Sequence, residues 1–311
     1  MKSGARAVAA AAETTAQSAR VGVLSGLAAY TLWGLFPLYL RLVRDVPPVE
    51  FLMHRMVWSA VLLFAILAVR RQWAWVRTAF RSPRAPRILG SFAASALFLS
   101  VNWFVYVWAA HADRVVDASL GYFINPLFSV ALGALFLRER LRRAQKVAVA
   151  LASAGVVWLI VQVGQVPWVG LALAGSFGMY GLLRKTAALG ALEGLALETL
   201  LLFPVAVATL GWLASHGQSG FVSGGGATRF FVLLAGPATT VPLLLFAASA
   251  RRLPLAVLGL LQYVGPTLQL LAGVLLLGEP FSGTKLIGYG FIWLGFGLAS
   301  ADGLRGTPRP A

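Results

Sequence analysis

The sequence contains no cysteine, only three histidines and only ten acidic residues among 311 positions. Without cysteine the chain has no disulfide, no thiolate nucleophile and no cysteine metal site. The histidines, His54, His111 and His216, have no spaced acidic partners that would complete a hydrolytic or metal-binding motif. Asp113 and Asp117 are two carboxylates without a third ligand, which makes a weak metal site. We therefore expect no catalytic residue, no metal and no cofactor, and an enzyme is only a remote alternative.

Charged residues are scarce as well, at 12% of the chain, whereas hydrophobic residues make up 59% and the mean hydropathy is +0.80. The apolar residues form runs of about twenty, long enough to cross a bilayer core of about 30 Å, and short basic links separate the runs. This pattern is typical of an all-α, multi-pass membrane protein that is surrounded by a lipid bilayer. Ten membrane spans are expected, at residues 21–40, 49–69, 88–110, 118–137, 145–163, 167–183, 194–214, 229–249, 253–277 and 284–301.

The net charge of +16 indicates membrane topology and not nucleic-acid binding, because the basic residues lie in the links instead of along one face. Twenty of the 26 Lys and Arg residues fall on the side of the N-terminus and five on the opposite side. The positive-inside rule therefore predicts that both termini are cytoplasmic. Residues 1–20, polar and rich in alanine, are expected to be a disordered cytoplasmic N-terminus, and residues 303–311 a cytoplasmic tail.

A stretch in the middle of the chain, residues 115–143, has a second copy at residues 253–282. With a shift of 140 positions, three pairs coincide: Pro126 with Pro266, Gly133 with Gly273, and Glu139 with Glu279. These matches indicate a duplication, with five spans in residues 21–163 and five in residues 167–302. Because five is odd, the second half must enter the membrane inverted, as in transporters built from inverted repeats. Both glutamates fall at span ends, where a helix-boundary role is expected, with proton binding as the alternative.

Several motifs carry a family resemblance. Among them are LAAYTLWGLFPLYLRLV, followed by VPPVEFLMHRMVWS, then DASLGYFINPLFSVALGALFLRERL and, near the end, LGLLQYVGPTLQLL. Over residues 20–302 the chain resembles the RarD branch of the EamA-type drug/metabolite transporters. The resemblance implies a bacterial inner-membrane transporter of ten helices, with a central cavity formed mainly by spans one to four and six to nine. It implies no firm substrate.

In such a chain the chemistry is sought in polar residues inside the membrane. A central Arg such as Arg55 costs roughly 2.5–3.5 kcal/mol on insertion scales, so a function is expected, with snorkelling to lipid headgroups as the alternative. An offset of 144 aligns His54 with Glu198, the carboxylate that lies clearly inside an apolar run. Since the halves are inverted, Arg55 should lie toward the external face and Glu198 toward the cytoplasmic face, and no direct ion pair is expected. The alternative for Glu198 is a local pair with Arg184 or Lys185.

Amides, phenols and one tryptophan supply the remaining candidates, with hydrogen bonding between helices as the alternative role for each amide. The expected substrate-binding residues are Trp33, His54, Arg55, Asn102, Tyr106, Tyr122, Asn125, Tyr180, Glu198, Gln262, Tyr263 and Gln269.

The most favoured function is a secondary transporter that exports small amphipathic metabolites, amino acids or drugs by alternating access. A passive channel or facilitator on the same scaffold is the main alternative. The sequence leaves open the substrate, the direction of transport, coupling to protons or sodium, and the oligomeric state.

Overall fold

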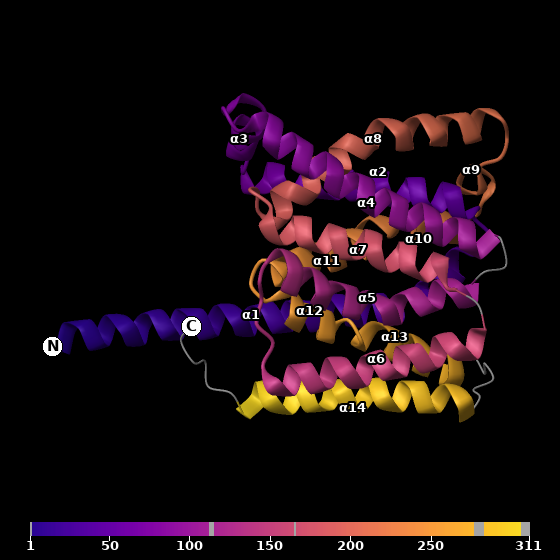
Figure 1. Ribbon diagram of the computed structural model, residues 1–311. Helices are drawn as coiled ribbons and strands as arrows, with labels where there is room; N and C mark the ends of the chain where they lie inside the picture. The colour runs from indigo at the N-terminus through magenta and orange to yellow at the C-terminus, as the bar shows by residue number, and fades with distance from the viewer. Residues whose placement is uncertain (1, 112–114, 165, 277–282, 306–311) are drawn as a thin grey trace.

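The computed structural model describes residues 2–111, 115–164, 166–276 and 283–305. The regular elements in these residues are all helices, which confirms the expected all-α class (Figure 1). In chain order they are α1 (Lys2–Leu40), η1 (Arg41–Val43), α2 (Pro48–Arg70), α3 (Ala74–Arg81), α4 (Ala85–His111), α5 (Val115–Phe136), α6 (Arg143–Val163), α7 (Trp168–Thr186), α8 (Ala191–Ser215), α9 (Gly220–Ser223), α10 (Gly226–Leu233), α11 (Ala235–Ala250), α12 (Leu255–Leu261), α13 (Val264–Leu271), the π-helix η2 (Ala272–Leu276) and α14 (Gly283–Arg305).

Seven helical stretches among the described residues are long and apolar enough to cross a membrane, and two shorter apolar helices run over Leu120–Phe136 and Leu286–Asp302. Large apolar side chains face outward from the bundle, and Val69, Leu135 and Leu275 are 86%, 75% and 73% exposed. Such a surface suits lipid, because contiguous apolar patches are unfavourable in water. The molecule is a multi-pass membrane protein, and the total of ten spans stays a prediction.

The N-terminal lead-in differs from its expected disorder. Helix α1 already begins at Lys2 and continues without a break to Leu40, so residues 2–20 are helical and extend beyond the bundle (Figure 1). The lead-in is rich in alanine and also contains Glu, Gln and Arg, which are strong helix formers. It also extends an existing membrane helix, so the unfavourable nucleation step of a separate helix is avoided.

Two of the expected spans are interrupted, and a proline explains each interruption. Pro237 lies four residues after Leu233, where α10 ends, and Pro266 lies four residues after Gln262, which separates α12 from α13. A proline ring clashes with the carbonyl of the residue four positions earlier and removes a backbone donor. Pro126 was also expected to disturb its span but stays inside the continuous helix α5.

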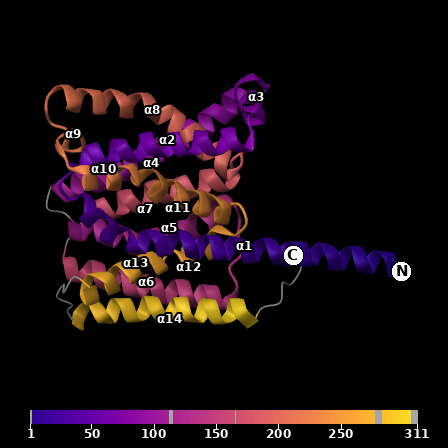
Figure 2. The same cartoon turned by 180° about the vertical axis from the view of Figure 1, so that it is seen from behind.

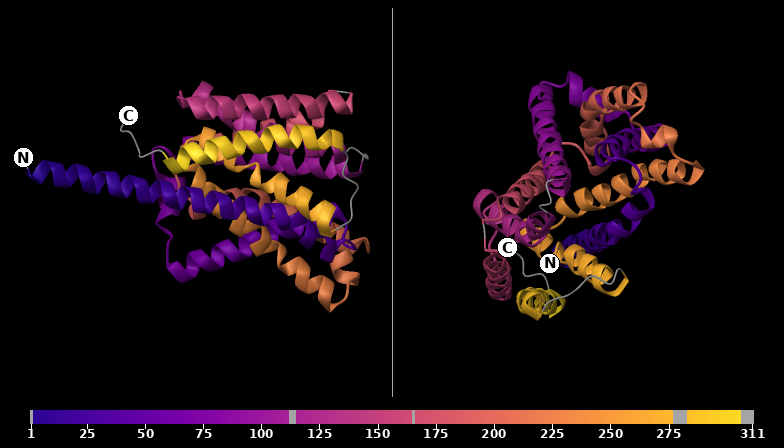
Figure 3. Two further views of the ribbon diagram at one scale, coloured as in Figure 1. Left: turned by 90° about the horizontal axis from the view of Figure 1, so that it is seen from below. Right: turned by 90° about the vertical axis from the view of Figure 1, so that its right-hand side faces the viewer.

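The helices pack in pairs that join the two halves of the sequence. Helix α5 lies against α7 and α12, α1 against α11 and α13, α4 against α7, and α2 against α8 and α11. Helices α6 and α14 lie side by side at one edge of the bundle, as Figures 2 and 3 show from other directions. Glycine permits the closest of these approaches, since a Cβ added to Gly155 of α6 would lie 2.5 Å from the carbonyl oxygen of Gly288 of α14.

The links between helices divide between two ends of the bundle. At one end, on the left of Figure 1, α1 enters the bundle, α14 ends and α3 lies, together with the links 137–142, 187–190 and 251–254. These segments, together with the helix ends that they join, hold most of the basic residues, so we call it the basic end. Helix α9 lies at the opposite end, which we call the far end. The two ends of the described chain therefore lie on the same side of the bundle.

Glu139 joins the two halves at the basic end. Its carboxylate accepts hydrogen bonds from the backbone N–H groups of Leu255 at 2.8 Å and Ala256 at 3.0 Å, which are the first residues of α12. A carboxylate at a helix N-terminus satisfies donors that have no partner inside the helix and interacts favourably with the helix dipole. The helix-boundary role of Glu139 is confirmed, whereas Glu279 lies outside the described residues.

Candidate functional site

A cavity of about 190 Å³ lies between helices of both halves, in the part of the bundle toward the far end. Helix α1 lines it near its C-terminal end, from Tyr30 to Leu40, and α7 from its N-terminal part to its middle, at Leu173 and Phe177. Eight of the twelve residues expected to bind substrate line this cavity: Trp33, Arg55, Asn102, Tyr106, Tyr122, Asn125, Gln262 and Gln269.

Arg55 is the charged residue of the cavity and projects into it from α2. Its Nε donates to Thr239 Oγ1 at 2.8 Å, and its guanidinium carbon lies 4.7 Å from the ring centre of Trp103 and 5.2 Å from that of Phe36. In the part of the chain that the structure describes, no carboxylate oxygen lies within 4.0 Å of its guanidinium. The aromatic faces stabilise the cation without neutralising it. This geometry favours a cavity role over snorkelling to headgroups.

The amides of the cavity also connect helices to one another. Asn102 Nδ2 donates to the carbonyl of Leu173 at 2.9 Å, and Gln262 Nε2 to Ser129 Oγ at 3.0 Å. Gln269 Nε2 donates to the carbonyl of Trp33 at 3.2 Å. Such bonds satisfy polar groups that lipid cannot.

Asn125 differs from these amides. Its Oδ1 is buried and accepts no hydrogen bond from the described residues. Because Asn125 lines the cavity, this oxygen is an acceptor that a solute can use.

Aromatic rings close the cavity toward the basic end. We call this group the aromatic floor, and it consists of Tyr30, Trp33, Phe177, Tyr180 and Phe246. Phe246 lies at its centre, with ring centres 5.1 Å from Phe177, 5.7 Å from Tyr180 and 5.8 Å from Trp33. Tyr30 and Tyr180 are only 4% and 0% exposed.

The opposite side of the cavity is more open. Tyr106 and Tyr122, whose ring centres lie 6.3 Å apart, are each 37% exposed. The cavity is therefore more accessible from the far end than through the aromatic floor.

A polar contact lies beyond the floor, at the basic end. Lys185 Nζ donates to the carbonyl of Leu253 at 2.5 Å and to that of Ala250 at 3.4 Å, and it lies 3.8 Å from Glu139. These bonds connect the end of α7 to the end of α11 and the link that follows it. They add a second closure to the aromatic one.

Four expected site residues do not line the cavity, because neighbouring positions on a helix point in different directions. Tyr263, next to Gln262, turns away and donates to the carbonyl of Phe123 at 3.4 Å. Tyr180 lies in the floor. His54, next to Arg55, packs against the ring of Phe221 of α9, with ring centres 4.6 Å apart. Glu198 belongs to a separate buried cluster.

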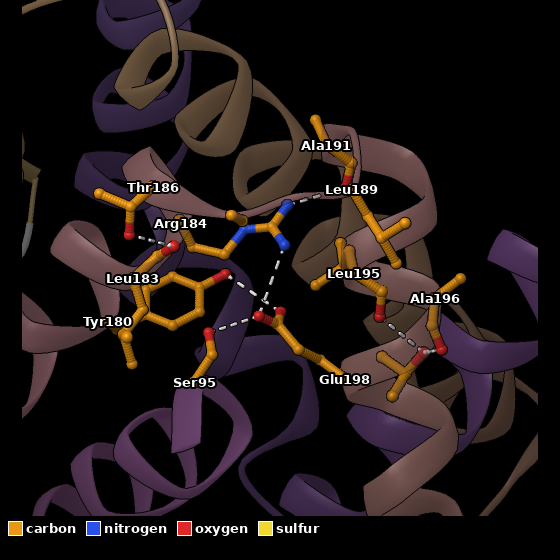
Figure 4. Close-up of polar contacts among 12 residues, drawn as sticks. Ser95, Tyr180, Leu183, Arg184, Thr186, Leu189, Ala191, Leu195, Ala196 and Glu198 are labelled. Carbon is orange, nitrogen blue, oxygen red and sulfur yellow. Dashed lines mark hydrogen bonds and ion pairs between the residues drawn. The ribbon is translucent and has the colours of Figure 1, made fainter. Parts of the chain in front are cut away.

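That cluster joins α7, α8 and α4 (Figure 4). Glu198 is 1% exposed, and its Oε1 lies 3.5 Å from Nη1 of Arg184, which is fully buried. Glu198 also accepts from the hydroxyl of Ser95 at 2.5 Å and from that of Tyr180 at 3.5 Å. The local pair with Arg184, one of the alternatives from the sequence, is therefore present, and no pair forms with Arg55.

Glu50 is a buried carboxylate that sequence reasoning missed. It is fully buried in the first turn of α2 and accepts from the hydroxyl of Ser219 at 2.5 Å and the backbone N–H of Gly220 at 2.8 Å. His54, four residues along the same helix, lies 3.6 Å away. The Glu50–His54 spacing was a visible signal, but nothing in the sequence identified the partner link 169 positions away.

Comparisons with known proteins agree with the helical membrane architecture. Residues 20–161 match the EamA-like transporter family. The chain is 45% identical to "Protein RarD" of Streptomyces exfoliatus, over 93% of this chain and 91% of that one, and 40% identical to "Protein RarD" of Escherichia coli (strain K12), over 93% and 97%. It is 36% identical to the "Chloramphenicol-sensitive protein RarD" of Pseudomonas aeruginosa, over 91% and 95%.

A solved structure described as "Crystal structure of protein" superposes with a TM-score of 0.67, over 90% of this chain and 97% of that one. The two sequences are 21% identical, so the likeness concerns the fold alone.

Proposed function

Because the chain belongs to the RarD branch of the EamA-like transporter family, we propose that it exports a small amphipathic solute across the bacterial inner membrane by alternating access. The chain is a membrane transporter of the drug/metabolite family. Membership of a transporter family also points away from enzymatic catalysis. The substrate class, the direction and the mechanism are the proposal.

The observation that carries the substrate class is the uncompensated charge of Arg55. A cation held between aromatic rings, with no carboxylate near it among the described residues, can bind an anionic group of the solute. The aromatic wall of the same cavity suits an apolar body, and Asn125 Oδ1 can accept from a solute N–H or O–H. Amino acids, aromatic metabolites and drugs with an acidic end combine these features.

The shape of the cavity supports alternating access. It is more open at the far end and is closed toward the basic end by the aromatic floor and the Lys185 contacts. In this mechanism a second state opens at the basic end and closes at the far end, and the solute site lies between the halves.

Two inverted halves supply the geometry for such an exchange, and the packing supports them. Each contact of a first-half helix has a counterpart in the other half: α1 with α11 corresponds to α7 with α4, and α5 with α7 corresponds to the α12–α13 rod with α1. Helices α6 and α14 pair with each other, as corresponding last helices of two repeats would. We propose ten spans on this basis, with both termini cytoplasmic because the basic end carries most of the positive charge.

A passive facilitator is the second candidate, and vesicle transport separates the two. Metabolites are first compared between cells with and without the protein, and each solute that changes is tested in proteoliposomes under imposed proton and sodium gradients. A coupled exporter accumulates the solute against its gradient, whereas a facilitator only equilibrates it. If no solute moves in either direction, the transport proposal is wrong.

A further inference from the structure

Arg184 and Glu198 form a charged pair that the proposed solute site does not use. Both are essentially unexposed, at 0% and 1%, and they lie on α7 and α8. Glu198 is seven residues beyond the start of α8, which places it about 10 Å along the helix at 1.5 Å per residue. Replacing a buried ion pair by apolar residues is often neutral or stabilising, so such a pair is weak evidence for a role in stability. Ionisable groups inside a membrane protein point instead to function.

The contact between the two charges is loose. Arg184 Nη1 lies 3.5 Å from Glu198 Oε1, compared with about 2.7–2.9 Å for a charge-assisted hydrogen bond. Neither Nε nor Nη1 of Arg184 makes a hydrogen bond to any residue that the structure describes, and Nη2 donates to the carbonyl of Ala191 at 3.0 Å. Coulomb attraction is therefore the main force between the pair. Neutralising Glu198 would leave the buried guanidinium without a counter-charge, held by the Ala191 carbonyl and by the ring of Phe92, whose centre lies 5.5 Å from the guanidinium carbon.

Glu198 is the acidic group of its surroundings. Helix α7 presents Tyr180 and Arg184 to it, and α4 presents Ser95. A void of about 10 Å³ beside Glu198, about the size that one water needs, is lined from the neighbouring helices by side chains that carry no acid or base: Met56 and Ser59 of α2, Leu99 and Trp103 of α4, and Thr239 and Leu243 of α11.

We propose that Glu198 is a proton-binding site whose protonation releases the closure at the basic end. A proton from water binds one carboxylate oxygen of Glu198, the negative charge disappears, and Arg184 loses its counter-charge. Arg184, two residues before the end of α7, then moves toward water at the basic end. Loss of the proton restores the pair and the closure. The inference extends the proposed transport cycle and rests on it for its purpose, but its test requires no transported solute.

Two contacts connect Glu198 to the closure. The hydroxyl of Tyr180 donates to Glu198, and its ring stacks on Phe246 at the centre of the aromatic floor, with 16° between the ring planes. Lys185, which follows Arg184 in the chain, holds the carbonyls of Ala250 and Leu253. A displacement of the end of α7 would therefore act on both the aromatic and the polar closure.

The same cluster adjoins the solute site. Leu99, Trp103 and Leu243 line both the large cavity and the void beside Glu198. Thr239 borders the void and accepts the hydrogen bond of Arg55. Binding at Arg55 and protonation at Glu198 can thus influence each other through three shared side chains and one threonine, without a direct ion pair.

The first test measures proton binding by infrared difference spectroscopy of the full chain in liposomes during a pH titration. The wild type should show the C=O stretch of a protonated carboxyl on acidification, and Glu198→Gln should lose that band. Glu193→Gln is the matched control, because Glu193 lies on the same helix, outside the buried cluster, and should leave the band unchanged. A band that persists in Glu198→Gln would overturn the assignment.

The second test measures opening at the basic end with a single reporter cysteine, since the native chain has none. Ala250→Cys places a fully buried thiol beside the Lys185 contact, and its reaction with a small methanethiosulfonate reagent is followed. The labelling rate is expressed relative to that of the same cysteine in the Glu198→Gln protein at the same pH. Acidification should raise this ratio by at least about fivefold, which is the lower end of typical coupling between two sites. Glu193→Gln should keep this response.

Equal pH dependence with and without Glu198 would exclude the coupling. Should Ala250→Cys fail to fold, Leu253→Cys reports on the same contact. A protein that passes both tests but moves no solute would leave the proton site standing and contradict only the transport proposal. Transport without either response would contradict only the proton site.

Discussion

Replacement of Arg55 tests the proposed recognition of an anionic solute. Its guanidinium donates to Thr239 and lies over two aromatic rings, which leaves further N–H donors to face the cavity. Lysine has the charge but cannot present a planar fork. A hydrogen bond to a charged group contributes about 1.5–3 kcal/mol, and each 1.4 kcal/mol corresponds to a factor of ten. Arg55→Lys should therefore insert normally and transport roughly 10- to 100-fold more slowly.

Arg55→Leu separates recognition from insertion. Removal of the charge should ease insertion by some fraction of the roughly 2.5–3.5 kcal/mol that a central Arg costs, so expression should equal or exceed that of the wild type while transport is lost. The assay is flux per inserted molecule in proteoliposomes, with Arg44→Leu as the control, because the Arg44 side chain is 82% exposed. Wild-type flux in Arg55→Leu would refute recognition by Arg55, and full activity of Arg55→Lys would favour a headgroup contact instead.

Three further predictions concern the architecture. Reporter fusions after Ala79, in the basic α3, should report a cytoplasmic location, and fusions at Ser223, in α9, an external one. A cytoplasmic location of Ser223 would contradict the inverted repeat. Cysteines at Ser129 and Gln262, whose side chains are hydrogen-bonded at 3.0 Å, should crosslink α5 to α12, with the single cysteines as controls; failure to crosslink would contradict this packing. Glu50→Gln should speed amide hydrogen exchange in α9, because it weakens the bonds that the Glu50 carboxylate accepts from Ser219 and Gly220. Exchange in α3 should not change. Unchanged exchange in α9 would show that the Glu50 bonds do not order this helix.

The helical membrane fold could be predicted from the sequence because two signals, the apolar runs and the basic links, recur along the whole chain. Apolar runs of about twenty residues and basic links each tolerate errors of several residues. The interruptions before Pro237 and Pro266 fit a proline clash four residues back, but a proline alone could not predict them, since Pro126 stays inside the continuous helix α5. Helix formation in residues 2–20 was not predicted because their low hydrophobicity indicated disorder. These residues have high helix propensity and extend a helix that the membrane span already forms.

The site was predicted only in part, because polarity inside an apolar run identifies a residue that needs a partner but not which partner. Arg55 and Asn125 face the cavity, while the adjacent His54 faces α9. One helical position rotates a side chain by about 100°, and no pattern in a run without charged neighbours fixes that rotation. The contacts of Glu50 depend on a segment of the other half, which no local signal reveals.

The sequence alignment relates His54 to Glu198, two positions that the structure does not bring into contact. Arg55, beside His54, lies in the cavity toward the far end, whereas Glu198 lies next to the floor that closes the cavity toward the basic end. The two charges do not pair in the structure, although the void beside Glu198 shares side chains with the cavity that holds Arg55. Because Arg55 and Glu198 do not pair directly, neither group is neutralised by the other, and each stays free to bind. The looseness of the Arg184–Glu198 contact has the same consequence, since a bidentate pair would hold the carboxylate charged in every state.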